Sequence, residues 1–475
     1  MKNTTVLLII LSLINGNTLL AQNYGVWKEI DSMNIARVGH AMVVLPNGDV
    51  LVSGSEADSI QSSAEIYEFS TGKWRYTSPM NVPRALHNLV LLNTGKVLAI
   101  GGYKEQSCEL FDPQTETWTM TDSIPTFRYF GQSVTELTDG RIMVAGGFYV
   151  DTTTWDFIIL KNVDIYDPIS EKWINAAQMN HERYGHTATL LNNGRVLISG
   201  GDTNMFTTSF CEIYDPIKNI WSNVMSMNEN RRYHASILLM NGNVFTSGGR
   251  NDAPILKSCE VYLINLNQWL PSSDLLIYRT DHQIYYLRKI DKLMIVGGGF
   301  LSFGPDTWEI YDQNQLEPIY YETFPINQQI VDNIVQLPNE NLFVSGGWEF
   351  LYNPMPNFWA SKRSWIFDVT TDVDQDKKTI IGYKLNQNFP NPFNPQTTIS
   401  YELPFNAYVK LIVYDILGNE VEILINEFQY AGTYDVNFKA KSLSSGVYYY
   451  RLTVMETEKS NGITFQQTKK MILLR

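Results

Sequence analysis

Short apolar segments alternate with turn-forming residues along most of the chain. In one such stretch, the mainly apolar residues 87–92 are followed by the turn Asn93–Gly95 and by a second apolar segment, residues 96–100. Because Asn and Gly adopt positive φ angles readily, this pattern is typical of a β-hairpin. A third apolar segment at residues 109–111 and a fourth around Trp118 complete the unit. The pattern therefore predicts four short strands joined by tight turns.

This four-strand unit recurs between residues 27 and 370. A glycine pair, or Ser-Gly in the first copy, ends the second strand of each unit: Ser53-Gly54, Gly101-Gly102, Gly146-Gly147, Gly200-Gly201, Gly248-Gly249, Gly297-Gly298 and Gly346-Gly347. The intervals between these pairs are 45 to 54 residues. A four-stranded unit repeated at such a period is typical of a β-propeller blade, whereas a solenoid or a jelly roll fits the regular period less well.

The copies number seven, and the last one is incomplete. Tryptophans mark the fourth strands at Trp74, Trp118, Trp173, Trp221 and Trp269. The seventh copy has no such strand, but a spare strand with Trp27 precedes the first copy. We expect this N-terminal strand to complete the last blade, since closing the ring leaves no exposed sheet edge. Pro318 replaces the tryptophan of the sixth copy, which predicts an irregular outer strand there.

The repeat resembles a known family. Phe111-Asp112-Pro113, Tyr166-Asp167-Pro168 and Tyr214-Asp215-Pro216 stand at fixed offsets between the glycine pairs and the tryptophans. Together these motifs resemble kelch repeats, in which each repeat forms one blade. The resemblance implies an all-β fold, a seven-bladed kelch-type β-propeller over residues 22–370. It is specific for the fold and says little about function.

Composition supports a folded, exported protein. Of the 475 residues, 44% are hydrophobic and 18% are charged, which is enough apolar material for a core. The net charge is −13, so binding to nucleic acid is not expected. Met1-Lys2, the apolar segment Val6–Ile14 and a short tail to Ala21 predict a signal peptide over residues 1–21. No later apolar run is long enough to span a bilayer, so the mature chain is expected to lack a transmembrane segment.

A different pattern begins after a charged linker at residues 371–383. In the linker, Asp372, Asp374 and Asp376 have the spacing of a calcium loop, but Lys377 and Tyr383 stand where Gly and Glu would be needed. We therefore interpret it as solvated. Beyond it, apolar segments at 398–403, 409–414, 434–438 and 447–454 predict a small Ig-like β-sandwich over residues 384–475.

The sandwich resembles the C-terminal sorting domain of the bacterial type IX secretion system. The matching motifs are Gln387–Pro395, Tyr414-Asp415 with Leu417-Gly418 and Glu420-Val421, Leu443–Tyr448, and the terminal Lys470-Met471. The resemblance implies passage through the periplasm and export by the type IX secretion machinery, which would be a partner of residues 384–475. It also implies a protein that is secreted or attached to the outer-membrane surface.

Six arginines occupy one repeat position between blades: Arg37, Arg84, Arg128, Arg183, Arg231 and Arg279. Five have a histidine three residues later, and Gly131 stands at that place in the third copy. One interpretation is architectural, with Arg and His bonding to backbone groups between blades. The other is a cationic ring that binds a ligand, since an Arg fork suits carboxylates. Kelch propellers that bind acidic peptides use arginines at this position, and the resemblance supports this second interpretation.

Aromatic residues accompany the arginines on the same predicted face. Because the chain reverses at each turn, the links between blades and the loops between second and third strands share one face. The candidate ligand-binding aromatics are Tyr129, Tyr184, Tyr233, Trp155, Trp348 and Trp359. They predict sugar stacking or peptide docking, although packing on the blades beneath is the alternative. The expected partner is an extracellular glycan or protein.

Catalysis finds little support in the sequence. Galactose-oxidase-like enzymes share the seven-bladed kelch fold and need copper held by two Tyr and two His, with one Tyr cross-linked to Cys. Tyr233-His234 is an adjacent pair, but His234 belongs to the repeat, and Cys108, Cys211 and Cys259 are expected to be small buried residues on third strands. We expect a binding protein without a cofactor. The alternative is an extracellular sugar-active enzyme of the epimerase or copper oxidase type.

Overall fold

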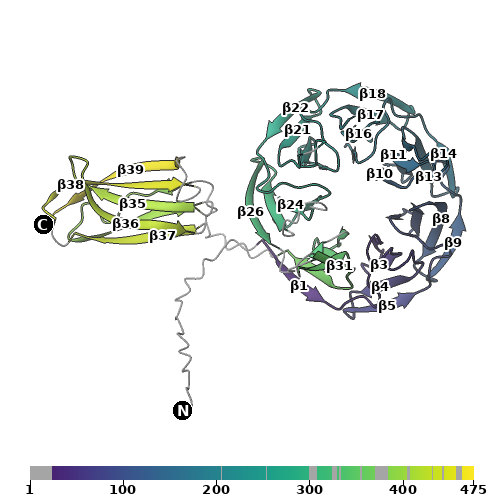
Figure 1. Cartoon of the computed structure of the whole chain (residues 1–475), viewed down its shortest axis with the longest axis horizontal. Coiled ribbons are helices and arrows are strands. Elements are labelled where there is room, and N and C mark those ends of the chain that lie inside the picture. The colour runs from purple at the N-terminus through teal and green to yellow at the C-terminus, as the bar shows by residue number, and fades with distance from the viewer. Residues whose placement is uncertain are drawn as a thin grey trace, which may run out of the picture. The chain divides into compact units, whose positions relative to one another are not determined.

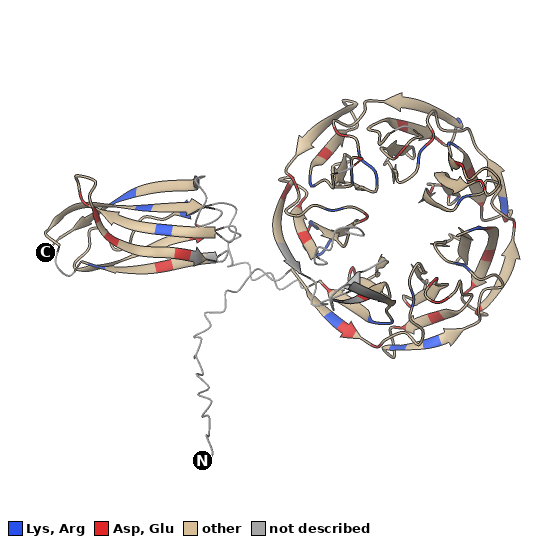
Figure 2. Ribbon diagram, viewed as in Figure 1, with Lys and Arg blue, Asp and Glu red and all other residues tan. Residues whose placement is uncertain are grey.

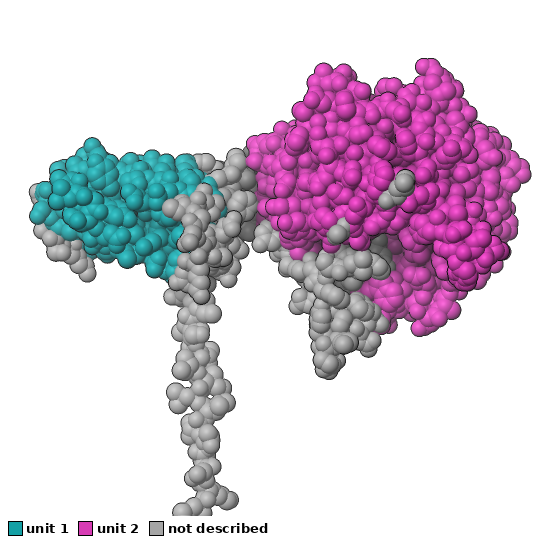
Figure 3. Space-filling view, turned by 45° about the horizontal axis from the view of Figure 1, so that its top comes forward, with its two compact units in different colours: residues 1–23, 372–475 teal, residues 24–371 magenta. Residues whose placement is uncertain are grey.

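The computed structural model describes residues 24–204, 206–252, 254–298, 307–323, 329–330, 333–352, 356–369, 383–403, 407–429, 432–440, 443–455 and 463–474. In these residues every regular element is a β-strand, which confirms the predicted all-β fold. The chain divides into two compact units, one starting at Tyr24 and ending at Thr371 and the other containing the C-terminal strands (Figure 3). The expected signal peptide and the Asp372–Asp376 motif lie outside the described residues.

The first unit is a ring of antiparallel sheets, which we number as blades 1 to 7 (Figure 1). Blades 1 to 3 contain β2–β5 (Ala41–Val44, Val50–Ser53, Ala64–Glu68, Lys73–Thr77), β6–β9 (Asn88–Leu91, Val97–Gly102, Glu105–Asp112, Thr117–Thr121) and β10–β14 (Phe130–Glu136, Ile142–Val150, Phe157–Ile159, Val163–Asp167, Lys172–Asn175). Blades 4 to 6 contain β15–β18 (Thr187–Leu190, Val196–Ser199, Cys211–Asp215, Ile220–Val224), β19–β22 (Ala235–Leu238, Val244–Ser247, Cys259–Leu263, Gln268–Ser272) and β23–β26 (Gln283–Leu287, Lys292–Val296, Thr307–Asp312, Glu317–Thr323).

Blade 7 draws its strands from both ends of the propeller. Its order is β1-β32-β29-β28, with bounds Val26–Ile30, Ser364–Asp368, Leu342–Ser345 and Ile334–Gln336. Trp27 of β1 lies opposite Phe367 of β32, and Lys28 forms an ion pair of 2.7 Å with Asp368. A further small sheet contains β27, β30 and β31, with bounds Gln329–Ile330, Trp348–Tyr352 and Pro356–Ala360. The N-terminal strand therefore holds the ring closed.

The hydrophobic core of the propeller lies between neighbouring blades, because each twisted sheet must bury both faces. Leu98 and Ile100 of blade 2, for example, cluster with Val144 and Tyr166 of blade 3. The repeat tryptophans add a hydrogen bond to each junction. Trp173 donates from Nε1 to the Asp122 carbonyl at 3.0 Å, and its equivalents in four other blades bond in the same way. The regular tryptophan spacing is thus explained by contacts between blades.

Deleting residues 22–30 is expected to lower the melting temperature of the propeller. The deletion removes β1 and the buried side chains of Tyr24 and Trp27, and it exposes the edge of β32. Loss of one large buried aromatic side chain costs about 3–5 kcal/mol. Thermal unfolding followed by circular dichroism measures the effect, with a chain that starts at Tyr24 as the control. An unchanged melting curve would contradict the closure.

Blade 6 departs from the regular pattern at the predicted place. The pairing of β25 with β26 shifts register between Ile310 and Tyr311, and Tyr311 lies opposite Pro318. Proline has no N–H to donate and is tolerated at a bulge on an outer strand. The expected irregularity of this strand is therefore confirmed.

The C-terminal unit is a sandwich of two antiparallel sheets. One sheet has the order β33-β34-β37 (Lys384–Leu385, Gln396–Leu403, Gly432–Lys439), and the other has the order β36-β35-β38-β39 (Glu420–Gln429, Ala407–Tyr414, Gly446–Met455, Ile463–Leu473). Ile399 and Tyr401 of the first sheet pack with Val409 and Leu411 of the second. Sequence patterning did not identify β36 and β39, because they are edge strands that carry many polar residues.

Candidate functional site

The six repeat arginines are buried in ion pairs inside the blades. Each guanidinium is at most 5% exposed and pairs with an acid on the third strand of its own blade. The pairs are Arg37–Glu65 at 2.9 Å, Arg84–Glu109 at 3.0 Å, Arg128–Asp164 at 2.7 Å, Arg183–Glu212 at 2.8 Å, Arg231–Glu260 at 3.0 Å and Arg279–Glu309 at 2.8 Å. Acidic residues recur around the ring on these strands (Figure 2).

The pairs also make hydrogen bonds to the backbone. Nη1 of Arg183 donates to the carbonyls of Gly200 and Phe210 at 2.7 and 2.9 Å, and Oε2 of Glu212 accepts the Asn180 N–H at 2.8 Å. The pair therefore ties the link between blades to the glycine pair and to the third strand. This geometry favours the architectural interpretation of the arginines, because Nη1 and Nη2 of Arg183 already have their partners within the blade.

Sequence reasoning missed the acidic partners of these arginines. The available signal was an acid two residues before the aromatic residue of the third strand, as in Glu212-Ile-Tyr214 and Glu260-Val-Tyr262. The acid follows its arginine by 25 to 36 residues, so only the folded blade brings the two together.

The repeat histidines are also buried. Burial, together with the charge of the neighbouring arginine, lowers the pKa of His40, His87, His186 and His282 to about 3, and the pKa of His234 is well below its usual value. These imidazoles are therefore neutral at physiological pH. Nε2 of His87 lies 2.9 Å from Oγ of Ser53 in the preceding blade.

The histidines explain the glycine at five of these seven positions, namely Gly54, Gly146, Gly200, Gly248 and Gly346. A Cβ at Gly200 would lie 2.4 Å from the Arg231 carbonyl oxygen and 2.7 Å from Cε1 of His234. The link of the next blade therefore packs directly on the glycine, and a methyl group would not fit. In blade 3, Gln132 and not Gly131 occupies the histidine position, and it lies opposite Gly146. The reason is that this copy has one extra residue after Arg128.

Six aromatic rings form a continuous row on the loop face of blades 2 to 5. We call these residues the aromatic row: Tyr103, Tyr129, Phe148, Phe157, Tyr184 and Tyr233. Successive ring centroids are 5.2, 6.4, 4.1, 5.5 and 6.1 Å apart. The rings come from the links between blades and from the loops after second strands, which the meander places on one face. Two predicted candidates, Tyr184 and Tyr233, are partly exposed within the row, whereas Tyr129 is buried.

Trp155 is the most exposed aromatic residue of this face. It lies at the tip of the β11–β12 hairpin, is 78% exposed and has a φ angle of 63°. The Trp155 N–H donates to the Asp151 carbonyl at 2.7 Å, and Oδ1 of Asp151 accepts the Thr153 N–H at 2.8 Å. A bulky residue in the left-handed region is unusual, so this turn holds the indole outward at a conformational cost.

A set of polar residues, which we call the mouth cluster, adjoins the aromatic row: Tyr184, Asp202, Thr207, Arg232 and Asp252. The Tyr184 hydroxyl donates to Oδ2 of Asp202 at 3.0 Å, and Arg232 forms an ion pair with the same carboxylate. Oγ1 of Thr207 donates to Oδ1 of Asp252 at 2.9 Å. These residues come from blades 4 and 5, so the cluster spans one blade junction.

Two further charged residues lie beside the mouth cluster. The backbones of Arg232 and Arg250 form an antiparallel bridge, which places the second arginine next to the cluster. Burial within the protein raises the pKa of Asp281, an effect that Arg250 and Arg232 oppose. Asp281 and Tyr233 have φ angles of 58° and 51° at equivalent positions of two neighbouring links.

The other two predicted tryptophans belong to a different blade. Trp348 and Trp359 lie on the β30–β31 hairpin, which belongs to the small sheet inserted between β29 and β32 of blade 7. Trp359 donates from Nε1 to Oε2 of Glu349 at 3.1 Å. The structure thus brings three of the six predicted aromatics into the row, places Trp155 beside it and leaves these two on the small sheet inserted in blade 7.

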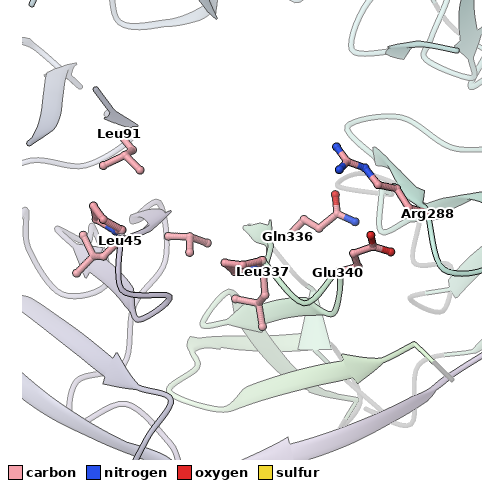
Figure 4. Close-up of a pocket in the computed structure, with 9 residues that line it drawn as sticks. Leu45, Leu91, Arg288, Gln336, Leu337 and Glu340 are labelled. Carbon is pink, nitrogen blue, oxygen red and sulfur yellow. The ribbon is translucent and has the colours of Figure 1, made fainter. Parts of the chain in front are cut away.

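A cavity lies on the opposite face, at the turns between first and second strands. Its volume is about 420 Å³, and Leu45, Leu91 and Leu337 line it together with Arg288 and Glu340 (Figure 4). The Lys289 N–H donates to Oε2 of Glu340 at 2.8 Å. The walls are mainly apolar, and they come from tight turns whose shape is set by the hairpins.

A copper centre of the galactose-oxidase type does not fit these residues. Among the described residues, no three His, Cys, Asp or Glu side chains gather to hold a metal. The repeat histidines lie at separate blade junctions, and His186, for example, is 3.0 Å from Oγ of Ser133 through Nε2. Cys108, Cys211 and Cys259 are buried free thiols on third strands, and burial raises the pKa of Cys211 to about 12.

Comparison with solved structures shows the fold. A fungal alcohol oxidase of the AA5 family, in complex with copper, superposes with a TM-score of 0.58 at 15% identity, covering 94% of this chain and 100% of that chain. YjhT superposes with a TM-score of 0.44 at 15% identity, covering 61% of this chain and 99% of that chain. The match to the oxidase supports the propeller architecture.

Among curated proteins, the spermatocyte protein spe-26 of Caenorhabditis elegans is 33% identical over 99 residues. That segment is 21% of this chain and spans 16% of the relative's length.

The C-terminal unit matches a family model. Residues 387–470 match the family described as the secretion system C-terminal sorting domain. The match covers the Gln387–Pro395 motif and most of the sandwich. In the described part of the chain, no helix is suited to crossing a membrane. Residues 387–470 are therefore a type IX secretion system C-terminal sorting domain, and the protein is secreted to the cell surface or beyond it.

Proposed function

We propose that this protein is an exported kelch-type propeller that binds an extracellular ligand through the loop face of blades 2 to 5. The observation that carries the proposal is the aromatic row with the exposed Trp155 beside it, on a scaffold held by buried ion pairs. Binding residues are commonly loop residues on a rigid framework. The glycine pairs and junction tryptophans support the kelch assignment of the blades.

Binding is favoured over catalysis by the state of the titratable groups. The histidines are neutral and buried, and the repeat arginines are paired, so neither set offers a free base or acid at the loop face. The mouth cluster contains an Arg–Asp pair, which an epimerase could use, but its members already bond to one another. We therefore propose a ligand-binding role and keep an enzymatic role as the outcome that turnover would reveal.

The proposed function predicts that substitution in the loop face weakens binding and leaves folding intact. The double variant Trp155→Ala with Phe157→Ala removes two exposed rings and is expected to weaken ligand binding at least about tenfold. Candidate ligands are first found on an array of glycans and cell-surface proteins. Titration calorimetry then measures the affinity of each protein for the ligand found. Tyr76→Ala, at an exposed tyrosine on the rim strand β5, is the matched control. Binding that is equal in all three proteins would place the site elsewhere.

Export is expected to depend on the C-terminal domain and not on the propeller. The two units have separate cores, so a chain that ends at residue 370 should fold. In the native host, this chain should accumulate in the periplasm, whereas the full chain reaches the surface or the medium. Immunoblots of cell fractions test this, and mass spectrometry of the exported form shows whether the domain is removed. Normal export of the shortened chain would contradict the assignment.

A further inference from the structure

The aromatic row is a supported surface rather than a set of loose side chains. Tyr129 and Phe148 are buried and form its floor, while Phe157 is 44% exposed and stacks on Phe148 at 4.1 Å with an interplanar angle of 28°. Tyr103 is exposed at the blade 2 end. Exposed rings held in this way lose little conformational entropy when they bind a ligand.

The mouth cluster offers donors and acceptors in alternation. Asp202 accepts from the Tyr184 hydroxyl and from Arg232, and Thr207 donates to Asp252. Asp202 and Thr207 are buried, whereas Tyr184 and Arg232 are partly exposed. A sugar hydroxyl both donates and accepts, so it can bond to the Tyr184 hydroxyl and to the Arg232 guanidinium at the exposed edge of the array. Tyr184 belongs to both the row and the cluster, which makes one surface that is apolar on one side and polar on the other.

The charges of this surface do not favour an anionic ligand. Two arginines, Arg232 and Arg250, stand among three acids, Asp202, Asp252 and Asp281. The repeat arginines add nothing to the surface charge, because each is buried in an ion pair. At the mouth cluster and the charged residues beside it, a carboxylate-rich ligand would therefore meet no net positive charge.

We infer that the loop face of blades 2 to 5 binds a chain of neutral sugars. The inference rests on the proposed binding function and names its ligand class. Sugar rings have apolar C–H faces that stack on aromatic rings and hydroxyl groups that need paired donors and acceptors. The row runs across four blades, from Tyr103 to Tyr233, so the ligand extends over more than one sugar ring. Phe157 and Trp155 stack with the sugars, while the partly exposed Tyr184 hydroxyl and Arg232 guanidinium bind hydroxyl groups.

The test uses the full chain and two series of oligosaccharides of one to six units. One series is neutral, made of β-linked and α-linked glucose, mannose and xylose oligomers, and the other is made of uronic acid oligomers. Titration calorimetry is carried out at low and high salt with the natural protein, with Phe157→Ala, with Tyr184→Phe and with the rim control Tyr76→Ala. Thermal unfolding of every variant shows that each protein is folded.

The expected result is binding of a neutral oligomer that tightens at least about tenfold between one and four units, with little salt dependence. Phe157→Ala should weaken binding about tenfold or more, Tyr184→Phe should weaken it less because the ring remains, and Tyr76→Ala should have no effect. Preference for uronic acid oligomers, with loss of binding at high salt, would overturn the inference and leave the proposed function standing. A protein ligand that depends on Trp155, with no sugar bound, would do the same. Absence of any ligand that depends on this face would overturn both.

Discussion

Lowering the pH from 7 to 5 is expected to destabilise the propeller strongly. The pKa of His40, His87, His186 and His282 is about 3 in the folded protein, against about 6.5 in the unfolded chain. Because the folded pKa is the lower one, the unfolded state binds more protons as the pH falls through 6.5, and stability is lost. Each histidine contributes a loss of about 2 kcal/mol by pH 5, and His234 acts in the same direction.

Urea unfolding at pH 7, 6 and 5 measures this effect. Carboxylates add little in this window, since their unfolded pKa values lie near 4. Gln132 occupies the histidine position of blade 3 and shows which replacement the fold accepts. The variant His87→Gln should therefore remain folded and lose about 2 kcal/mol less than the natural protein between pH 7 and pH 5. A free energy of unfolding that stays constant between pH 7 and 5 would contradict the burial of neutral histidines.

Glu212→Ala is expected to destabilise the propeller by about 3–5 kcal/mol, because it leaves the Arg183 guanidinium buried without its counter-charge. The backbone N–H of Asn180 also loses its acceptor. Such a loss is a large fraction of the stability of a typical domain. Denaturant unfolding measures it, and the equivalent change in another blade, Glu65→Ala, should behave alike.

Blade 7 supplies the control for this prediction. Trp365 stands where the other blades have their acid, and the chain contains no arginine between residues 289 and 362. The blade thus lacks both partners and relies on apolar packing. The double variant Arg183→Met with Glu212→Leu should accordingly lose less stability than Glu212→Ala alone. If Glu212→Ala lowered the free energy of unfolding by less than about 1 kcal/mol, the buried ion pair would not stabilise the blade as its geometry indicates.

The sequence identified the elements that repeat. The glycine pairs, tryptophans and hairpin turns predicted strands and blades, because spacing along the chain is preserved when each repeat folds locally. The C-terminal motifs likewise predicted a sorting domain, since Gln387–Pro395 and Tyr414-Asp415 are contiguous signals. Missed elements, such as β39, carry polar residues that weaken the apolar pattern at a sheet edge.

Only the tertiary structure decided what the repeated polar residues do. From the sequence, the role of the arginines was undecided between a ligand-binding ring and a buried framework, because the pattern around Arg183 is the same in either case. Its partner Glu212 lies 29 residues away in the sequence. The two side chains meet only when the link between blades packs on the third strand. The aromatic row has the same origin. Tyr103 and Tyr233 are separated by 130 residues of sequence, and they belong to one surface because the blades close into a ring. No local sequence pattern encodes this long-range arrangement.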